Sequence, residues 1–119
     1  MVKANRIQDK ARGVGFDWEN VNQVFEKVKE EFAELHDEVI IKNNKTKVEK
    51  EFGDVLFSLI NYARFIGVDP ELALERTNKK FISRFSFLEK EVDRKGLNLD
   101  SMSLEEMDNL WKESKKKYP

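Results

Sequence analysis

Cysteine is absent from this sequence, and helix breakers are scarce, with two prolines and five glycines among 119 residues. The absence of cysteine excludes disulfides, thiolate zinc sites and a cysteine nucleophile, and it fits a reducing compartment. Long apolar runs and a hydrophobic signal core are also missing, so we expect a cytoplasmic protein that does not enter a membrane. Because long alternating patterns of β-branched residues are absent as well, an all-α fold is favoured.

An excess of charge of one sign is missing too, because 22 lysines and arginines nearly balance 23 aspartates and glutamates. This balance argues against a nucleic-acid binder, which usually needs a dominant basic field. The charges are nevertheless segregated along the chain. Residues 26–38 carry six acidic residues and two lysines, whereas residues 76–95 carry seven basic and three acidic residues. This distribution suits a metal ion on one helix and phosphates on another.

The length of the chain and its 39% hydrophobic residues predict a single domain over residues 1–119. Apolar spacing predicts helices over residues 4–12, 18–42, 47–66 and 70–94, and a final helix after Ser103. The expected helix starts carry Asp17, Thr46 with Glu49, Asp69 with Pro70, and Ser103 with Glu106. The short polar turn at 43–45 makes the second and third helices antiparallel, and the third is apolar almost all round. We therefore expect a bundle of about four to five helices with an antiparallel central pair.

Two acidic pairs lie on these consecutive helices, near the turn. Glu31 and Glu34 are three residues apart, as are Glu51 and Asp54, and this spacing places each pair on one helix face. Because the helices are antiparallel neighbours, the pairs can converge across their interface. The alternative is that they are solvated surface charges, which is the common role of an E-E-x-x-E sequence on its own.

Four carboxylates without histidine or cysteine form a hard, all-oxygen ligand set. Such a set selects Mg²⁺ or Mn²⁺ over zinc or copper. A divalent ion would also relieve the repulsion between the carboxylates. Because magnesium usually takes phosphate oxygens as further ligands, the acidic pairs predict a nucleotide or pyrophosphate site.

Basic and aromatic residues later in the chain are weaker candidates. Lys80 and Arg84 lie four residues apart on one helix face that suits phosphates, although a solvated basic face is the alternative. Trp111 on the final helix could stack on a base, although a tryptophan at helical spacing commonly belongs to a core.

Longer motifs accompany the acidic pairs: E-E-F-A-E at 30–34, E-F-G-D-V-L-F at 51–57, V-G-F-D-W at 14–18, N-K-K-F-I-S-R-F at 78–85 and K-G-L at 95–97. Together they resemble the carboxy-terminal catalytic domain of MazG, an all-α nucleoside triphosphate pyrophosphohydrolase, along nearly the whole chain. The acidic motif alone also occurs in dUTPase-like, dCTP-type and phosphoribosyl-ATP relatives. The resemblance leaves open whether the chain is a piece of a longer two-domain protein.

The resemblance implies hydrolysis of a nucleoside triphosphate to a monophosphate and pyrophosphate, in house-cleaning of the nucleotide pool, by a homodimer. Metal ligands would be Glu31, Glu34, Glu51 and Asp54. Substrate contacts would be Glu30, Lys47, Lys80, Arg84 and Trp111. The bound metal would activate a water, and Glu31 or Glu34 could accept its proton as the catalytic base.

One position departs from the MazG pattern, and two other functions stay open. Lys50 stands where an acidic residue often precedes the glutamate of E-x-x-D, which leaves the number of metal ions open. The chain could instead be a non-catalytic helical module that binds a partner or senses nucleotides. It could also be an enzyme restricted to one deoxynucleotide, such as dUTP or dCTP.

Overall fold

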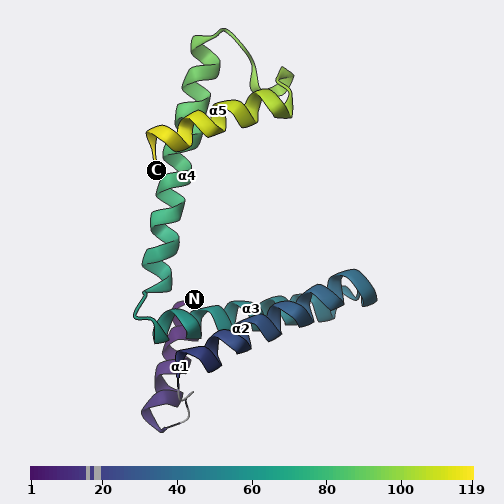
Figure 1. Cartoon of the computed structure of the whole chain (residues 1–119), viewed down its shortest axis with the longest axis vertical. Helices are drawn as coiled ribbons and strands as arrows, with labels where there is room; N and C mark the ends of the chain where they lie inside the picture. The colour runs from purple at the N-terminus through teal and green to yellow at the C-terminus, as the bar shows by residue number, and fades with distance from the viewer. Residues whose placement is uncertain (16, 18–19) are drawn as a thin grey trace. The chain divides into compact units, whose positions relative to one another are not determined.

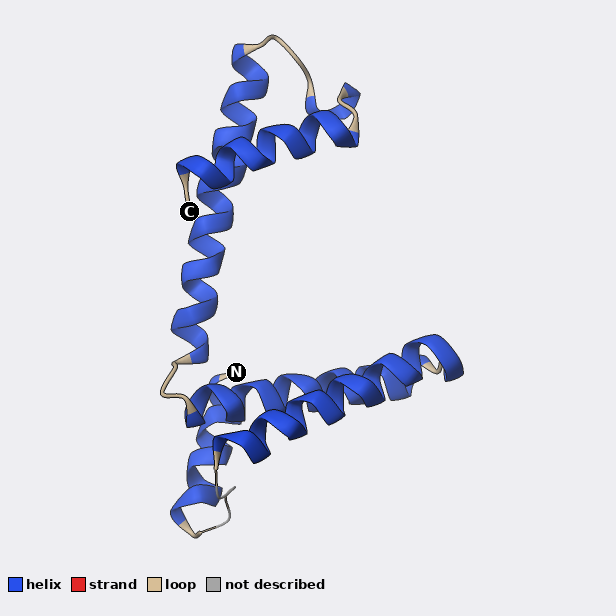
Figure 2. Cartoon of the chain, in the orientation of Figure 1, coloured by secondary structure: helices blue, strands red, loops and turns tan. Residues whose placement is uncertain are grey.

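The computed structural model describes residues 1–15, 17 and 20–119, and among these residues it contains helices and turns but no strand (Figure 2). This confirms the all-α prediction. The helices are α1 (Val2–Gly13), α2 (Val21–Asp37), the π-helix η1 (Glu38–Lys42), α3 (Lys45–Phe65), α4 (Pro70–Arg94), the short 3₁₀-helix η2 (Leu99–Ser101) and α5 (Leu104–Lys117). None of the described helices is both long and apolar enough to cross a bilayer. The chain forms two compact units, residues 1–71 and 72–119, and the prediction of a single domain stays a prediction.

The first unit is built on a hairpin of α2 and α3, which lie side by side, with α1 packed against α3 (Figure 1). The buried apolar side chains of the hairpin are Val24 and Val28 on α2 and Val55 and Ile60 on α3. They recur at helical spacing, so each helix turns one stripe to its neighbour. The antiparallel central pair predicted from the short turn is therefore present.

The turn between these helices differs in detail from the prediction. The second helix was expected to continue to Lys42, but its last turn is a π-helix from Glu38. Asn43 then takes a left-handed conformation, with φ of 50°. Asn44 caps α3, because its side chain accepts hydrogen bonds from the backbone N–H groups of residues 46 and 47. The predicted capping box of Thr46 and Glu49 was therefore wrong, since asparagine at this position already satisfies the free N–H groups.

The start of α2 also lies later than predicted. Asn20 is the N-cap and accepts from the backbone N–H of Gln23 at 3.0 Å, whereas the prediction placed the cap at Asp17. The predicted first residue, Trp18, lies outside the described residues.

The third helix carries more apolar side chains than the first unit covers. The side chain of Phe52 is 54% exposed, and those of Leu56, Phe57 and Leu59 are exposed as well. The apolar character that predicted a central helix is thus real, but within this unit α1 and α2 cover only part of it.

The second unit is held by a small core between α4 and α5. Leu88, Val92 and Leu110 are buried together, and Trp111 packs against them. The predicted capping box of Ser103 and Glu106 is present at the start of α5. Gly96, with φ of 68°, lets the chain turn after α4.

Candidate metal site

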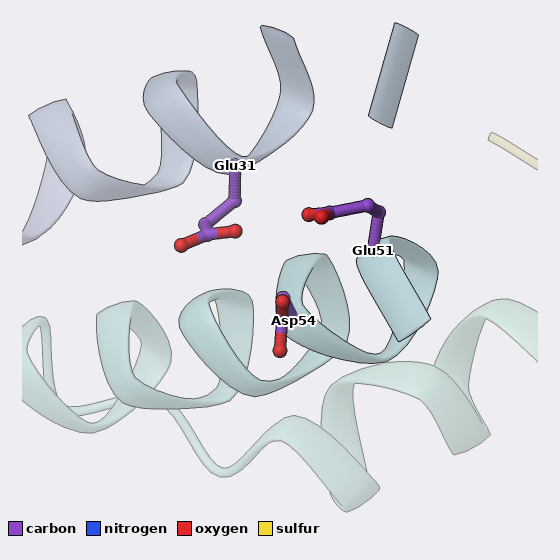
Figure 3. Close-up of side chains that lie close together, drawn as sticks. All are labelled: Glu31, Glu51 and Asp54. Carbon is purple, nitrogen blue, oxygen red and sulfur yellow. The ribbon is translucent and has the colours of Figure 1, made fainter. Parts of the chain in front are cut away.

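Three of the four predicted carboxylates meet between α2 and α3. Glu31 projects from α2 toward Glu51 and Asp54 on α3 (Figure 3). One oxygen atom from each lies within 4.8 Å of the others. The hairpin produces this convergence, because its two antiparallel helices place acidic residues near the turn at the same level.

The carboxylates of this group are poorly compensated by the protein itself. Glu31 is 7% exposed, and its Oε1 atom accepts from Lys27 Nζ at 2.8 Å. Its Oε2 atom and the Oε2 atom of Glu51 are buried without a hydrogen-bond partner among the described residues. Burying charged oxygens unpaired is costly. The arrangement therefore fits a bound cation that would take these free oxygens as ligands.

Glu34 stands beside this group without joining it. Its side chain is exposed, and it is not one of the residues whose carboxylate oxygens lie within 4.8 Å of one another. The negative charge of Glu31, followed by desolvation and by Glu51, raises the pKa of Glu34 above its usual value. The pKa of Lys27 is raised as well, chiefly by its hydrogen bond to Glu31, which stabilises the charged ammonium group. Both shifts indicate a concentration of negative charge.

Comparison with known proteins decides the family. Residues 19–86 match the MazG nucleotide pyrophosphohydrolase domain, which is more than half of the chain. The chain belongs to the MazG nucleotide pyrophosphohydrolase family. The acidic pairs E-E-x-x-E and E-x-x-D both lie inside the matched region, so the converging carboxylates are part of this MazG domain.

Named MazG proteins are similar over most of the chain. A Thermotoga maritima protein, the nucleoside triphosphate pyrophosphohydrolase/pyrophosphatase MazG, is 41% identical over 112 residues, or 94% of this chain and 42% of that protein. The Escherichia coli K12 nucleoside triphosphate pyrophosphohydrolase is 36% identical over 117 residues, or 98% of this chain and 44% of that protein. The uncharacterized Bacillus subtilis protein YabN is 52% identical over 68 residues, 57% of this chain and 14% of YabN. The chain thus spans less than half the length of these curated relatives.

The other predicted contacts of the first unit lie on its surface. Glu30 is 3.6 Å from the ammonium of Lys27, which also contacts Glu31. Lys47 is exposed in the first turn of α3. Lys50, where this MazG domain departs from the expected pattern, is also exposed. The roles predicted for Glu30 and Lys47 stay predictions.

The remaining predicted contacts belong to the second unit. Lys80 is exposed on α4. Arg84 donates from Nε to the carbonyl oxygen of Tyr118 at 2.9 Å and from Nη2 to that of Pro119 at 3.2 Å. Trp111 is half-buried, with its ring 5.3 Å from that of Phe81. Trp111 therefore packs within the second unit. The predicted contacts of Lys80, Arg84 and Trp111 with substrate stay predictions.

Sequence reasoning missed several residues near the carboxylates. Lys27 lies four residues before Glu31, and this spacing could have signalled their ion pair. Glu38 lies two helical turns after Glu31 and is buried, and one of its oxygens has no partner within the described ranges 1–15, 17 and 20–119. A pocket that includes Gln8 and Arg64 joins residues far apart in the sequence, so no local pattern could have predicted it.

Proposed function

We propose that this domain hydrolyses nucleoside triphosphates to nucleoside monophosphates and pyrophosphate with bound Mg²⁺, as part of house-cleaning of the nucleotide pool. The observation that carries the proposal is the convergence of Glu31, Glu51 and Asp54, in which Glu31 and Glu51 each have a buried oxygen without a partner among the described residues. Membership of the MazG family and the names of the Thermotoga maritima and Escherichia coli relatives support the reaction class.

The carboxylates are suited to magnesium or manganese. Each supplies oxygen ligands, and no cysteine exists in the chain to favour a softer metal. Glu31, Glu51 and Asp54 would hold the ion, and Glu34 would complete the set after a change of side-chain rotamer. When bound, such an ion neutralises phosphate charge and lowers the pKa of a coordinated water.

The chain's own residues would orient the reactants and accept the proton of the attacking water. Glu31 has one oxygen held by Lys27 and the other buried. Glu34 is exposed beside the group, so water can reach its carboxylate. We therefore favour Glu34 over Glu31 as the proton acceptor. Lys47, Lys80 and Arg84 would bind phosphate oxygens, and Trp111 would contact the nucleotide.

We also propose that the domain acts as a homodimer. The exposed apolar side chains of α3, including Phe52 and Leu56, form a surface of the kind that oligomers bury. Sedimentation measured over a range of protein concentrations tests this proposal, and a monomer at every concentration would contradict it.

The reaction is tested by measuring pyrophosphate release from the eight canonical nucleotides, with and without Mg²⁺. We expect turnover that requires the metal and that falls by about 10²-fold or more in Asp54→Asn. Asp37→Asn, which changes an exposed aspartate on α2, is the matched control and should remain active. A folded protein without turnover would contradict the proposal and favour a non-catalytic module.

A further inference from the structure

A pocket of about 340 Å³ lies in the first unit between α1 and α3. Small-molecule pockets usually measure about 300–1,000 Å³, so this one has room for a single small ring system. Ile7 and Ala11 of α1 and Phe57 of α3 supply apolar surface to its wall. Such a lining suits a flat heteroaromatic ring.

The pocket continues the face of α3 that carries the acidic group. Phe57, Asn61 and Arg64 all line it, and they follow Asp54 by three, seven and ten residues. At 1.5 Å per residue they lie roughly 5 to 15 Å farther along the same helix face. The sugar and base of a nucleotide together extend along this part of the helix, so a nucleotide with its phosphates at the carboxylates would bring its base to the pocket.

Two side chains of the pocket contain buried polar atoms that no described residue pairs with. Gln8 is 5% exposed, and its Nε2 atom donates to the carbonyl oxygen of Phe57 at 2.8 Å, which fixes the amide. Its Oε1 atom is left as an acceptor with no partner among the described residues. Arg64 uses Nη2 for Asp17 and Asn61, while its Nε and Nη1 atoms are buried donors for which the described part of the chain supplies no partner. A ligand in the pocket is a source of the missing hydrogen bonds.

We propose that Gln8 and Arg64 select bases that present a ring N–H beside a carbonyl group, an inference that rests on the proposed function. The ring N–H would donate to Oε1 of Gln8. The carbonyl oxygen would accept from one of the two free nitrogens of Arg64. Guanine, hypoxanthine, uracil and thymine have this edge. Adenine and cytosine reverse this order: a ring lone pair would face Oε1 of Gln8, and an amino group would face the N–H donor of Arg64.

Matched substrates that differ only at this edge test the selection. We expect kcat/KM in Mg²⁺ to be about tenfold or more higher for inosine triphosphate than for ATP, and for UTP than for CTP. Gln8→Leu and Arg64→Met should bring both ratios toward one. Damage to the fold would instead lower the rates for all four substrates together. The controls are Gln23→Leu and Arg94→Met, which change exposed residues outside the pocket and should keep the wild-type ratios.

The outcomes separate this inference from the proposed function. Equal kcat/KM within both pairs would overturn base selection and leave the pyrophosphohydrolase intact. If no triphosphate is hydrolysed, calorimetric binding of inosine monophosphate and AMP tests the pocket directly. Tighter binding of inosine monophosphate, lost in Gln8→Leu, would support the pocket without catalysis. Equal binding of the two nucleotides, or binding of neither, would overturn it. Because Arg64 also pairs with Asp17, circular dichroism checks that Arg64→Met is folded.

Discussion

The two compact units differ in whether their buried side-chain polar atoms have hydrogen-bond partners. In the first, buried polar atoms of five side chains have no partner among the described residues: Gln8, Glu31, Glu38, Glu51 and Arg64. In residues 72–119, all of which are described, buried side-chain polar atoms have partners. Ser114, fully buried, donates to the carbonyl oxygen of Trp111, and Ser103 and Glu106 cap each other.

This difference separates a unit organised for ligands from one organised for its own packing. Unpaired buried polar groups destabilise a fold unless something else binds them. In the first unit all of them except Glu38 lie at the metal group or in the pocket, where a cation and a base could supply the partners. In the second unit, Arg84 and Trp111 already have contacts within the unit, so any role with substrate would add to a structural one.

The largest expected effect is on catalysis by the first unit. Glu51→Gln should lower kcat/KM for pyrophosphate release by about 10²-fold or more, because it removes a charged oxygen ligand from the site. Glu49→Gln changes an exposed glutamate on the same helix and should have little effect. Similar losses in both variants would show that charge on α3, rather than the buried group, matters.

A second test compares the packing of the two units. Leu110→Ala should lower the free energy of unfolding by about 2–5 kcal/mol, because Leu110 is buried in the core of the second unit. Phe52→Ala should cost about 0.5 kcal/mol or less in dilute protein, where its ring is exposed. If a second copy covers Phe52, this cost should grow with protein concentration. Urea unfolding at two concentrations measures both effects, and an equal cost for the two variants would contradict the comparison.

Much of the fold could be predicted because local sequence determines it. Pro70 begins α4 after Asp69, and Ser103 with Glu106 begins α5, as their capping patterns indicated. The turn before α3 was mispredicted because two candidate caps, Asn44 and Thr46, stand close together, and propensity alone does not choose between them. The π-helix at Glu38 has no sequence pattern that distinguishes it from a regular last turn.

In the candidate site, too, some features follow from local sequence and others only from tertiary packing. The convergence of Glu31, Glu51 and Asp54 could be predicted from the sequence, because helical spacing and a short turn define their geometry. Gln8 contacts Phe57 across 49 positions of the chain, so only tertiary packing reveals it. The side-chain position of Glu34 depends on the charges around it and could not be predicted from spacing alone.

A smaller effect is expected from the basic side chains of the second unit. Arg84→Met should lower kcat/KM by about tenfold through a higher KM, because one charge-assisted contact to phosphate is lost. Lys80→Met separates this role from packing, since Lys80 is exposed whereas Arg84 also holds the carbonyl groups of residues 118 and 119. Arg94→Met is the control. An unchanged KM in both Lys80→Met and Arg84→Met would confine the second unit to a structural role.

The smallest expected effect is on melting temperature in metal-free buffer, where Glu34→Gln and Glu91→Gln should shift it in opposite directions at neutral pH. The pKa of Glu34 is raised by repulsion from Glu31, so its charge opposes folding. Glu34→Gln should therefore raise the melting temperature at neutral pH, and the gain should vanish as the pH falls and the wild-type carboxyl is protonated. The pKa of Glu91 is lowered by its hydrogen bond to Arg94, so its charge favours folding. Glu91→Gln should lower the melting temperature at neutral pH, and this loss should vanish as the pH falls through the folded pKa of Glu91.

Thermal melts of both variants from neutral pH to about pH 3 measure these differences. We expect them to be small, because Glu34 is exposed and Glu91, although partly buried, pairs with the exposed Arg94. Adding Mg²⁺ sharpens the comparison. A cation bound at Glu31, Glu51 and Asp54 would attract the charge of Glu34, so the advantage of Glu34→Gln should shrink or reverse, whereas Glu91→Gln should not respond. A Mg²⁺ response of equal size in both variants would indicate general screening of charge instead of a bound ion.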